Sequence, residues 1–454
     1  MLQKISSLWN RIPSAWRFAL AAFLAVRIAL TLWSFVVYWI FPVALQNIDL
    51  FGEPVLTLFN LQTSERYAYS RTTGGTTLSF RALDERFMAD DQTGSVWSMR
   101  NGRAIQGSYA GTSLEPSAYK VENIFPYLGV KPAENIALSL WQRFDANWYL
   151  KIAERGYEAD DGSTVYFPTY PFLIRVLAFF LDPMLASLVI SNISLIGVIG
   201  LLYQLTASIT TEDTAPRTVV YLLLFPTGFF LTGAYTESLF LFFVLASLFA
   251  ASRGRWTWSA VWGMLSSLTR LQGVLLVIPL AWLAWRETRG LAMREKLARY
   301  ALLTLIPLAT VSFLAFTSLS LISTYEGTLH ARFVSPWGNI LAAASLVLGG
   351  KGSMVDALNL VFTLWLIAML VPVWRKLPIE YFLYTLSMLV APMLRMTTTQ
   401  PLVSMMRYAL AVFPVFMVLG YWGENKRVNR IIVYLSLLLQ LYLSAQFILW
   451  GWVG

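Results

Sequence analysis

The sequence of 454 residues contains no cysteine and a single histidine, His330. Without cysteine the chain forms no disulfide and no thiolate metal site, and one imidazole argues against zinc or iron centres, which normally need several. Charged residues are scarce, at 13% of the chain, against about 25% in ordinary soluble domains. Hydrophobic residues make up 57%, so the composition indicates a membrane protein. The net charge of +9 is then better explained by cytoplasmic loops than by nucleic-acid binding.

Nucleotide-binding loops and internal repeats are missing as well. No GxxxxGK[ST] segment occurs, and no GxGxxG follows a predicted strand. These absences argue against an ATP-driven pump, because such a pump needs a loop that cradles phosphates.

Apolar runs of roughly 20 residues recur along most of the chain, and each is long enough to cross about 30 Å of hydrocarbon. With the N-terminus inside, most lysines and arginines of the short connections fall on the cytoplasmic side, as the positive-inside rule requires. We therefore predict an all-α polytopic membrane protein of about eleven transmembrane helices. The predicted spans are residues 17–42, 184–208, 216–232, 235–252, 256–270, 271–286, 300–322, 356–374, 378–394, 404–422 and 430–451.

The sequence divides into four predicted parts. Residues 1–42 hold the first transmembrane helix, which lacks a clear cleavage site and so is no signal peptide. Residues 43–140 form an external insertion with short strands and glycine-rich turns. Residues 141–183 hold interfacial helices, including the short stretch 168–182, and residues 184–454 form the transmembrane bundle.

The segment WQRFDANWYLKIAERGY, residues 141–157, is unusually charged and aromatic for its place beside membrane helices. Phe144, Trp148 and Ile152 recur every four residues, which predicts a helix. One interpretation is that Asp145 caps this helix while the aromatic side chains lie in the membrane interface. The other is that Asp145 is a carboxylate at the water–lipid boundary, where partial desolvation increases its basicity.

Two further ionisable residues are predicted near the same membrane face. Glu237 is costly at its depth unless it is paired or faces a cavity, and Arg270 is a reasonable partner. A purely structural ion pair is an equally good interpretation of these two residues.

Other polar side chains fall on that face too. His330 is more often a hydrogen-bonding group than a catalyst, and Arg407 and Tyr408 could simply snorkel to the interface. Taken together with Arg332, however, the arginines suit a phosphate, which a guanidinium binds through two parallel hydrogen bonds. A carboxylate for proton abstraction beside such arginines suggests group transfer from a lipid phosphate.

Four segments together resemble a known family. FDANWYLKIAERGY, YFPTYPFLIR, FPTGFFLTGAYTESLFLFF and SSLTRLQGVLL, in this order, are similar to the PIG-V-type mannosyltransferases, relatives of glycosylphosphatidylinositol mannosyltransferase II in the GT-C class. The resemblance covers about residues 141–286, with a weaker similarity around SMMRYALAVFPVF. Two departures are Phe144, where the family often has tryptophan, and the long external insertion, which leaves the acceptor open.

The resemblance implies an inverting transfer from a polyprenyl- or dolichyl-phosphate sugar, mannose being favoured, on the external face and without an essential metal or other cofactor. It implies that Asp145 is the catalytic base. The residues predicted to bind substrate are Trp148, Tyr149, Arg155, Tyr157, Phe167, Tyr170, Tyr235, Glu237, Arg270, Gln272, His330, Arg332, Arg407 and Tyr408.

The sequence does not identify the acceptor or the membrane, and it is compatible with two other functions. The acceptor could be a glycolipid, a glycan or a protein side chain, and short loops without cysteine are consistent with a prokaryotic plasma membrane. A transporter or flippase of lipid-linked sugars could use the same arginines, although the matched halves typical of transporters are missing. A membrane scaffold that acts through the external insertion is the second rival.

Overall fold

The structure is a computed structural model that describes residues 12–50, 52–158, 161–290, 292–318, 326, 331–397 and 400–453. The chain forms two compact units. The larger contains the described residues up to Ala29 together with Tyr149–Leu441, and the smaller contains Leu30–Trp148 and Tyr442–Val453. Two long helices and one short one, α2 (Ser14–Ile40), α20 (Lys426–Ile448) and α5 (Asp145–Arg155), contribute residues to both units.

The larger unit is built almost entirely from helices. They are α6 (Thr169–Leu177), α7 (Pro183–Ile209), α8 (Thr214–Leu224), α9 (Glu237–Ser252), α10 (Trp256–Ser267), α11 (Val277–Glu287), α12 (Met293–Leu303), α13 (Leu305–Phe316), α15 (Pro336–Leu348), α16 (Met354–Lys376), α17 (Ile379–Met393), α18 (Met405–Tyr408) and α19 (Phe413–Trp422). Short 3-10 helices occur at η1 (Ser163–Val165), η2 (Gly228–Leu231), η3 (Leu271–Leu276) and η4 (Ala409–Ala411). Strands β10 (Ala331–Phe333) and β11 (Arg395–Thr397) pair antiparallel.

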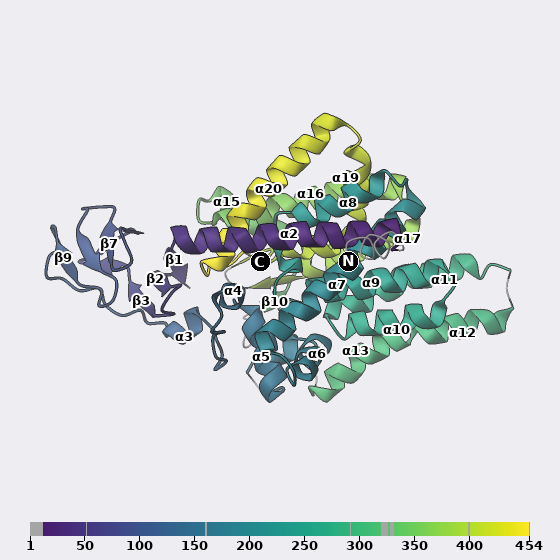
Figure 1. Cartoon of the computed structure of the whole chain (residues 1–454), viewed down its shortest axis with the longest axis horizontal. Coiled ribbons are helices and arrows are strands. Elements are labelled where there is room, and N and C mark those ends of the chain that lie inside the picture. The colour runs from purple at the N-terminus through teal and green to yellow at the C-terminus, as the bar shows by residue number, and fades with distance from the viewer. Residues whose placement is uncertain are drawn as a thin grey trace, which may run out of the picture. The chain divides into compact units, whose positions relative to one another are not determined.

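Neighbouring helices of this unit pack side by side. Figure 1 shows α9 to α13 as one group, in which α10 contacts both α9 and α13. The long helix α7 packs against α8 and α9, and α8 packs against α19. Helix α7 begins at Pro183, and the Asp182 carboxylate accepts a hydrogen bond from the Leu185 N–H at 3.0 Å. Such a cap satisfies a backbone donor that the helix itself leaves unpaired.

The protein is a multi-pass membrane protein, but the predicted count of eleven spans is not confirmed. Among the described residues, five helical segments are long and apolar enough to cross a membrane: Ser14–Ile40, Pro183–Ile209, Met293–Phe316, Met354–Lys376 and Lys426–Ile448. A sixth is possible if Met405–Ala411 and Phe413–Trp422 count as one broken span, since they meet at an angle of 79°. The remaining predicted spans are helical but shorter, because turns and 3-10 segments interrupt their apolar runs.

The smaller unit contains the strands. One antiparallel sheet consists of β1 (Val43–Leu50), β2 (Glu53–Asn60) and β3 (Arg66–Ser70), and another of β6 (Phe80–Ala82), β7 (Phe87–Asp90), β8 (Val96–Ser98) and β9 (Ala104–Gln106). A short hairpin joins β4 (Thr72–Thr73) to β5 (Thr76–Thr77). Beyond Gln106 the segment up to residue 140 holds the short helices α3 (Val121–Ile124) and α4 (Ile136–Ser139) instead of strands.

A single apolar core joins the sheets of the smaller unit. Leu56 and Leu58 from β2 lie in it with Met88 from β7 and Trp97 from β8, all almost fully buried. The Asn47 side chain makes two hydrogen bonds to the backbone of Phe80, at 2.7 and 2.8 Å, and so ties β1 to β6. Because buried polar groups are costly unless paired, these contacts favour one register of the strands.

Candidate active site

The charged aromatic segment forms the helix that its periodicity predicted. Helix α5 begins at Asp145, which is half-buried, and ends before Gly156, whose φ of +84° suits a residue without a side chain. Phe144, just before the helix, has a φ of +46°, a conformation that is strained for an aromatic residue. Its ring packs edge-on against Trp450 and Trp452, with centroids 5.3 and 5.0 Å apart, which holds the strained turn in place.

A buried arginine, Arg143, lies immediately before this turn, and the sequence pattern alone does not distinguish it. The Arg143 Nε donates to the Ile448 carbonyl at 3.0 Å, and one terminal nitrogen donates to the Ser139 carbonyl at 2.6 Å. Its guanidinium also lies over the Trp450 ring at 4.8 Å. These contacts fix the backbone from which Asp145 projects.

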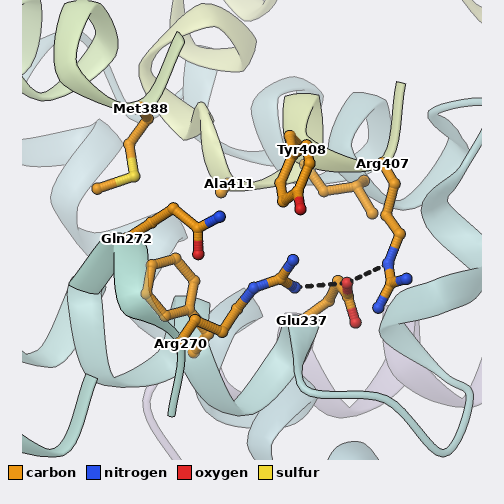
Figure 2. A pocket seen from close by; sticks show the side chains of 9 residues that line it. Glu237, Arg270, Gln272, Met388, Arg407, Tyr408 and Ala411 are labelled. Carbon is orange, nitrogen blue, oxygen red and sulfur yellow. Dashed lines mark hydrogen bonds and ion pairs between the residues drawn. The ribbon is translucent and has the colours of Figure 1, made fainter. Parts of the chain in front are cut away.

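Three ionisable side chains converge in the larger unit. Glu237, the first residue of α9, accepts hydrogen bonds on one oxygen, Oε1, from a terminal nitrogen of Arg270 and from the Nε of Arg407, both at 2.5 Å. Figure 2 shows the carboxylate between the two guanidinium groups. The predicted pair of Glu237 and Arg270 is therefore present, and Arg407 is a second partner that the sequence did not indicate.

This carboxylate and the two arginines line a small pocket. Gln272, Tyr408 and Ala411 lie on its other sides, as Figure 2 shows, and Phe240, Met388 and Leu410 complete the lining. The free volume is about 10 Å³, which is room for about one water molecule. Among the described lining residues, two guanidinium groups and one carboxylate carry a net positive charge, which favours an anionic ligand.

Aromatic rings hold both arginines in place. The Arg407 guanidinium lies 4.7 Å from the Tyr235 ring centre and 4.8 Å from that of Phe230. The Arg270 guanidinium lies 5.4 Å from the ring of Tyr408. Cation–π contacts of this kind stabilise a desolvated guanidinium and restrict its rotation.

A polar chain links the pocket wall to helices α5 and α6. The Tyr149 hydroxyl lies 3.3 Å from the Thr236 hydroxyl, which in turn lies 3.4 Å from the Arg270 guanidinium. The Tyr170 hydroxyl lies 2.8 Å from that of Ser191, which donates to the Tyr235 carbonyl at 3.0 Å. Both tyrosines are buried, so the family-like residues of three separate segments share one hydrogen-bonded region.

The segment that carries Arg407 is fixed by side chains from distant helices. Its backbone turns through Leu402 and Ser404, whose φ values of +52° and +66° are uncommon for residues other than glycine. Asn339 of α15 accepts from the Leu402 N–H at 2.8 Å, and Asn359 of α16 accepts from the Met406 N–H at 3.0 Å. These two side-chain amides accept hydrogen bonds from backbone N–H groups that an irregular turn would otherwise leave unpaired.

A separate ion pair ties the end of α5 to the following loop. The Lys151 ammonium lies 2.7 Å from Asp161 and 3.3 Å from Glu158. Burial acts to raise the pKa of the Asp161 carboxyl, but hydrogen bonds from Lys151 and Ser163 and the Lys151 charge hold that pKa below its ordinary value. Burial likewise acts to lower the pKa of Lys151, and its two carboxylate partners raise it above the ordinary value.

We expect this pair to stabilise the fold only while both groups are charged. Because the folded-state pKa of Asp161 is lowered, its contribution is present above the unfolded pKa of about 3.9 and is lost as the pH falls through the folded value. The melting temperature of Asp161→Asn should therefore lie below that of the wild type by a constant amount between about pH 5 and pH 9. The difference should begin to narrow near the unfolded pKa of about 3.9 and should close only below the folded pKa, so a difference that stays constant as the pH falls well below about 3.9 would contradict the assignment.

The other predicted site residues are dispersed. Tyr157 and Phe167 lie against Phe313, with ring centroids 5.5 and 4.8 Å away, beside an apolar cavity rather than in the charged pocket. Arg155 at the end of α5 and Arg332 in β10 are exposed, and neither lines the pocket. Trp148 is half-buried. His330 lies outside the described residues.

Several lining residues carry no signal in the sequence. Met388, Leu410 and Ala411 resemble any other apolar residue of a membrane helix, and only the fold brings them to the arginines. Across the described parts of the chain, no three histidine, aspartate or glutamate side chains lie close enough to bind one metal ion together.

Comparison with known proteins agrees with the motifs. Residues 122–328 match the family profile described as mannosyltransferase (PIG-V), so the predicted resemblance is confirmed over this segment. Among solved structures, a match is ArnT from Cupriavidus metallidurans in the apo state, which is 14% identical with a TM-score of 0.40, over 70% of this chain and 75% of that one. No curated protein shows significant similarity to the sequence.

Proposed function

We propose that this chain, whose residues 122–328 match the family profile described as mannosyltransferase (PIG-V), is a glycosyltransferase that transfers a sugar from a lipid-linked phosphate to an acceptor hydroxyl. The family description favours mannose as the sugar. The observation that supports a lipid-linked phosphate as the donor is the buried pocket in which two arginines face one carboxylate.

The phosphate of the donor would bind at Arg270 and Arg407. A guanidinium presents parallel N–H groups to the oxygens of a phosphate, and burial strengthens the attraction by excluding water. In the structure Glu237 accepts a hydrogen bond from each guanidinium, which orients both arginines. Gln272 and Tyr408 add hydrogen-bonding groups to the lining of the pocket.

Asp145 would act as the general base. Its carboxylate accepts the proton of the acceptor hydroxyl while that oxygen forms a bond to the anomeric carbon. The bond from this carbon to the phosphate oxygen breaks on the opposite face, its electron pair leaves with the phosphate, and the configuration inverts. The arginines neutralise the developing charge, so no second carboxylate is needed to protonate the leaving group.

The lipid part of the donor has a candidate groove in the same unit. A cavity of about 450 Å³ is lined by Tyr157, Pro168 and Phe313 together with Met264, Leu268, Ala309, Ser312 and Phe316. Most of these side chains are apolar, and the exposed fraction of Phe316 is 73%, as expected for a surface that faces lipid. We assign the groove to the isoprenoid chain of the donor, since that chain is the apolar part of the proposed substrate.

A bulky residue in this groove should change the preference for the donor's chain length. Ala309 of α13 is half-buried in its wall, so Ala309→Trp fills space that an isoprenoid would occupy. Transfer from a long-chain donor should fall about tenfold or more, because several buried methylene groups contribute about 0.8 kcal/mol each. Transfer from a donor with one isoprene unit should change little, and an equal loss with both donors would exclude this groove.

The side of the membrane and the need for a cofactor are the last two properties of the proposed reaction. We propose that the reaction takes place on the external face of a plasma membrane, with the N-terminus in the cytoplasm, because this orientation leaves most basic residues of the short connections inside. We also propose that transfer needs no metal and no other cofactor, so the rate should be unchanged by EDTA.

The test is transfer of labelled mannose by purified protein in liposomes, from polyprenyl-phosphate mannose to a crude lipid and glycan extract. Formation of a labelled product supports the proposal. If the labelled carrier crosses the bilayer while no product forms, the result favours the alternative function, a flippase of lipid-linked sugars. The same arginines would bind the phosphate of the carrier in such a flippase.

A further inference from the structure

The smaller unit contains a pocket that the proposed reaction does not use. It has a volume of about 390 Å³, within the range of about 300–1,000 Å³ typical of small-molecule sites. Strands β1 to β3 and the turns next to β7 and β8 supply its walls. Its lining residues are Val43, Leu58, Asn60, Glu65, Tyr67, Glu85, Arg86, Phe87, Ser98, Met99 and Arg100.

The turns around this pocket are fixed by local hydrogen bonds. The Asn60 side chain accepts from the N–H groups of the next turn at 2.8 and 2.9 Å. The Asp84 carboxylate accepts from the N–H groups of Arg86 and Phe87, both at 2.7 Å. On the third side, the Tyr69 hydroxyl donates to the carbonyls of Met99 and Arg100, which lie 3.1 and 2.8 Å away. A rim held in this way loses little conformational entropy when a ligand binds.

The lining chemistry identifies the class of ligand. Val43, Leu58 and Met99 form an apolar floor beside the half-buried rings of Tyr67 and Phe87. Two glutamates and two arginines stand at the rim, so the pocket has no net charge. In the described part of the chain these four side chains form no ion pair with one another.

A neutral saccharide matches this arrangement. A pyranose ring presents a face of C–H groups that packs on an aromatic or apolar surface, and an edge of hydroxyl groups that both donate and accept. Carboxylates accept from those hydroxyls, and guanidinium and amide groups donate to them. An anionic ligand would need an excess of arginine, and a cation would need an excess of glutamate.

We infer that this pocket binds a neutral oligosaccharide, and that in the full reaction this oligosaccharide is part of the acceptor. The second half of this inference rests on the proposed function, whereas saccharide binding itself does not. The inference narrows the acceptor to a molecule that carries a glycan, and it gives the strands between residues 43 and 106 a role in choosing it.

The first experiment measures binding without donor. Purified full-length protein in detergent is applied to an array of neutral, sialylated and sulfated oligosaccharides. We expect binding to a subset of the neutral ones, and no binding to any of them, or to charged ones alone, would overturn the inference.

A second experiment tests whether this pocket is the binding site. It measures how tightly variants of the pocket bind the neutral oligosaccharide that the wild type binds best. Glu85→Gln removes one charged acceptor at an exposed position and should weaken binding about tenfold or more. Tyr67→Ala should also weaken binding about tenfold or more. Because Tyr67 packs on the core, the Tyr67→Ala variant could misfold, and in that case the result for Glu85→Gln alone tests the pocket. The matched control is Glu122→Gln, an exposed carboxylate of the same unit outside the pocket, which should bind like the wild type. Unchanged binding by Glu85→Gln would overturn the inference.

A transfer assay separates this inference from the proposed function. Protein that transfers the sugar but binds no neutral oligosaccharide would refute the pocket and leave the function intact. Protein that binds a neutral oligosaccharide in the pocket but never transfers sugar would support the pocket and refute the function.

Discussion

Replacing Asp145 with asparagine should reduce sugar transfer about 10²–10⁴-fold, because removing a positioned proton acceptor typically costs that much. The substitution keeps the shape of the side chain at the start of α5 and removes only its charge. Transfer of labelled mannose in liposomes measures the effect, and the melting temperature of the variant should stay close to that of the wild type.

The matched control for this variant is Glu154→Gln. Glu154 lies on the same helix α5 and is exposed, so losing its charge should leave both transfer and stability unchanged. Near-normal turnover by Asp145→Asn would remove the base from the mechanism. In that case the proton would have to leave the acceptor by another route, and the role implied by the family motif would be wrong.

The second large effect is expected at Glu237. Its carboxylate is 4% exposed and lies between the guanidinium groups of Arg270 and Arg407. Glu237→Gln removes the negative charge that both guanidinium groups share, and breaking a buried ion pair in this way typically costs about 3–5 kcal/mol. The melting temperature in detergent should fall sharply, and transfer should be lost with it.

Two further variants test this explanation. Glu380→Gln removes a similar carboxylate whose partner, Arg286, is 45% exposed, so the loss should stay within about 1 kcal/mol. The double variant Glu237→Gln with Arg270→Gln removes one of the two unbalanced charges, so it should be more stable than Glu237→Gln alone. If the double variant is less stable instead, packing rather than charge dominates the site.

Much of the fold could be predicted from hydropathy, whereas the continuity of the helices could not. Within the described residues, each of the eleven predicted spans overlaps helical structure. The predicted span 271–286 consists of the 3-10 helix η3 followed by α11, and the predicted span 404–422 is bent by 79°. An average over apolar residues does not detect such breaks in the backbone. Helix α15 was missed because its apolar run is too short to stand out.

In the candidate site, too, some features could be predicted from the sequence and others could not. The pairing of Glu237 with Arg270 could be predicted because an unpaired carboxylate at that depth is costly. That Arg407 shares the carboxylate depends on a turn through Leu402 and Ser404, whose left-handed conformation no composition rule indicates. Arg332 was grouped with them by its membrane face alone, and it lies exposed on β10 instead.

The tight pocket around Glu237 has a consequence for the rate of the reaction. With about 10 Å³ of free volume, a phosphate group enters only if a side chain moves first. Asn339 and Asn359 hold the backbone that carries Arg407, whereas Arg270 follows α10 and its side chain is 16% exposed, against 6% for Arg407. If the donor phosphate binds between the two arginines as proposed, we therefore expect Arg270 to be the side chain that releases Glu237 and turns toward the phosphate. The rate of this rotation would then set an upper limit on turnover.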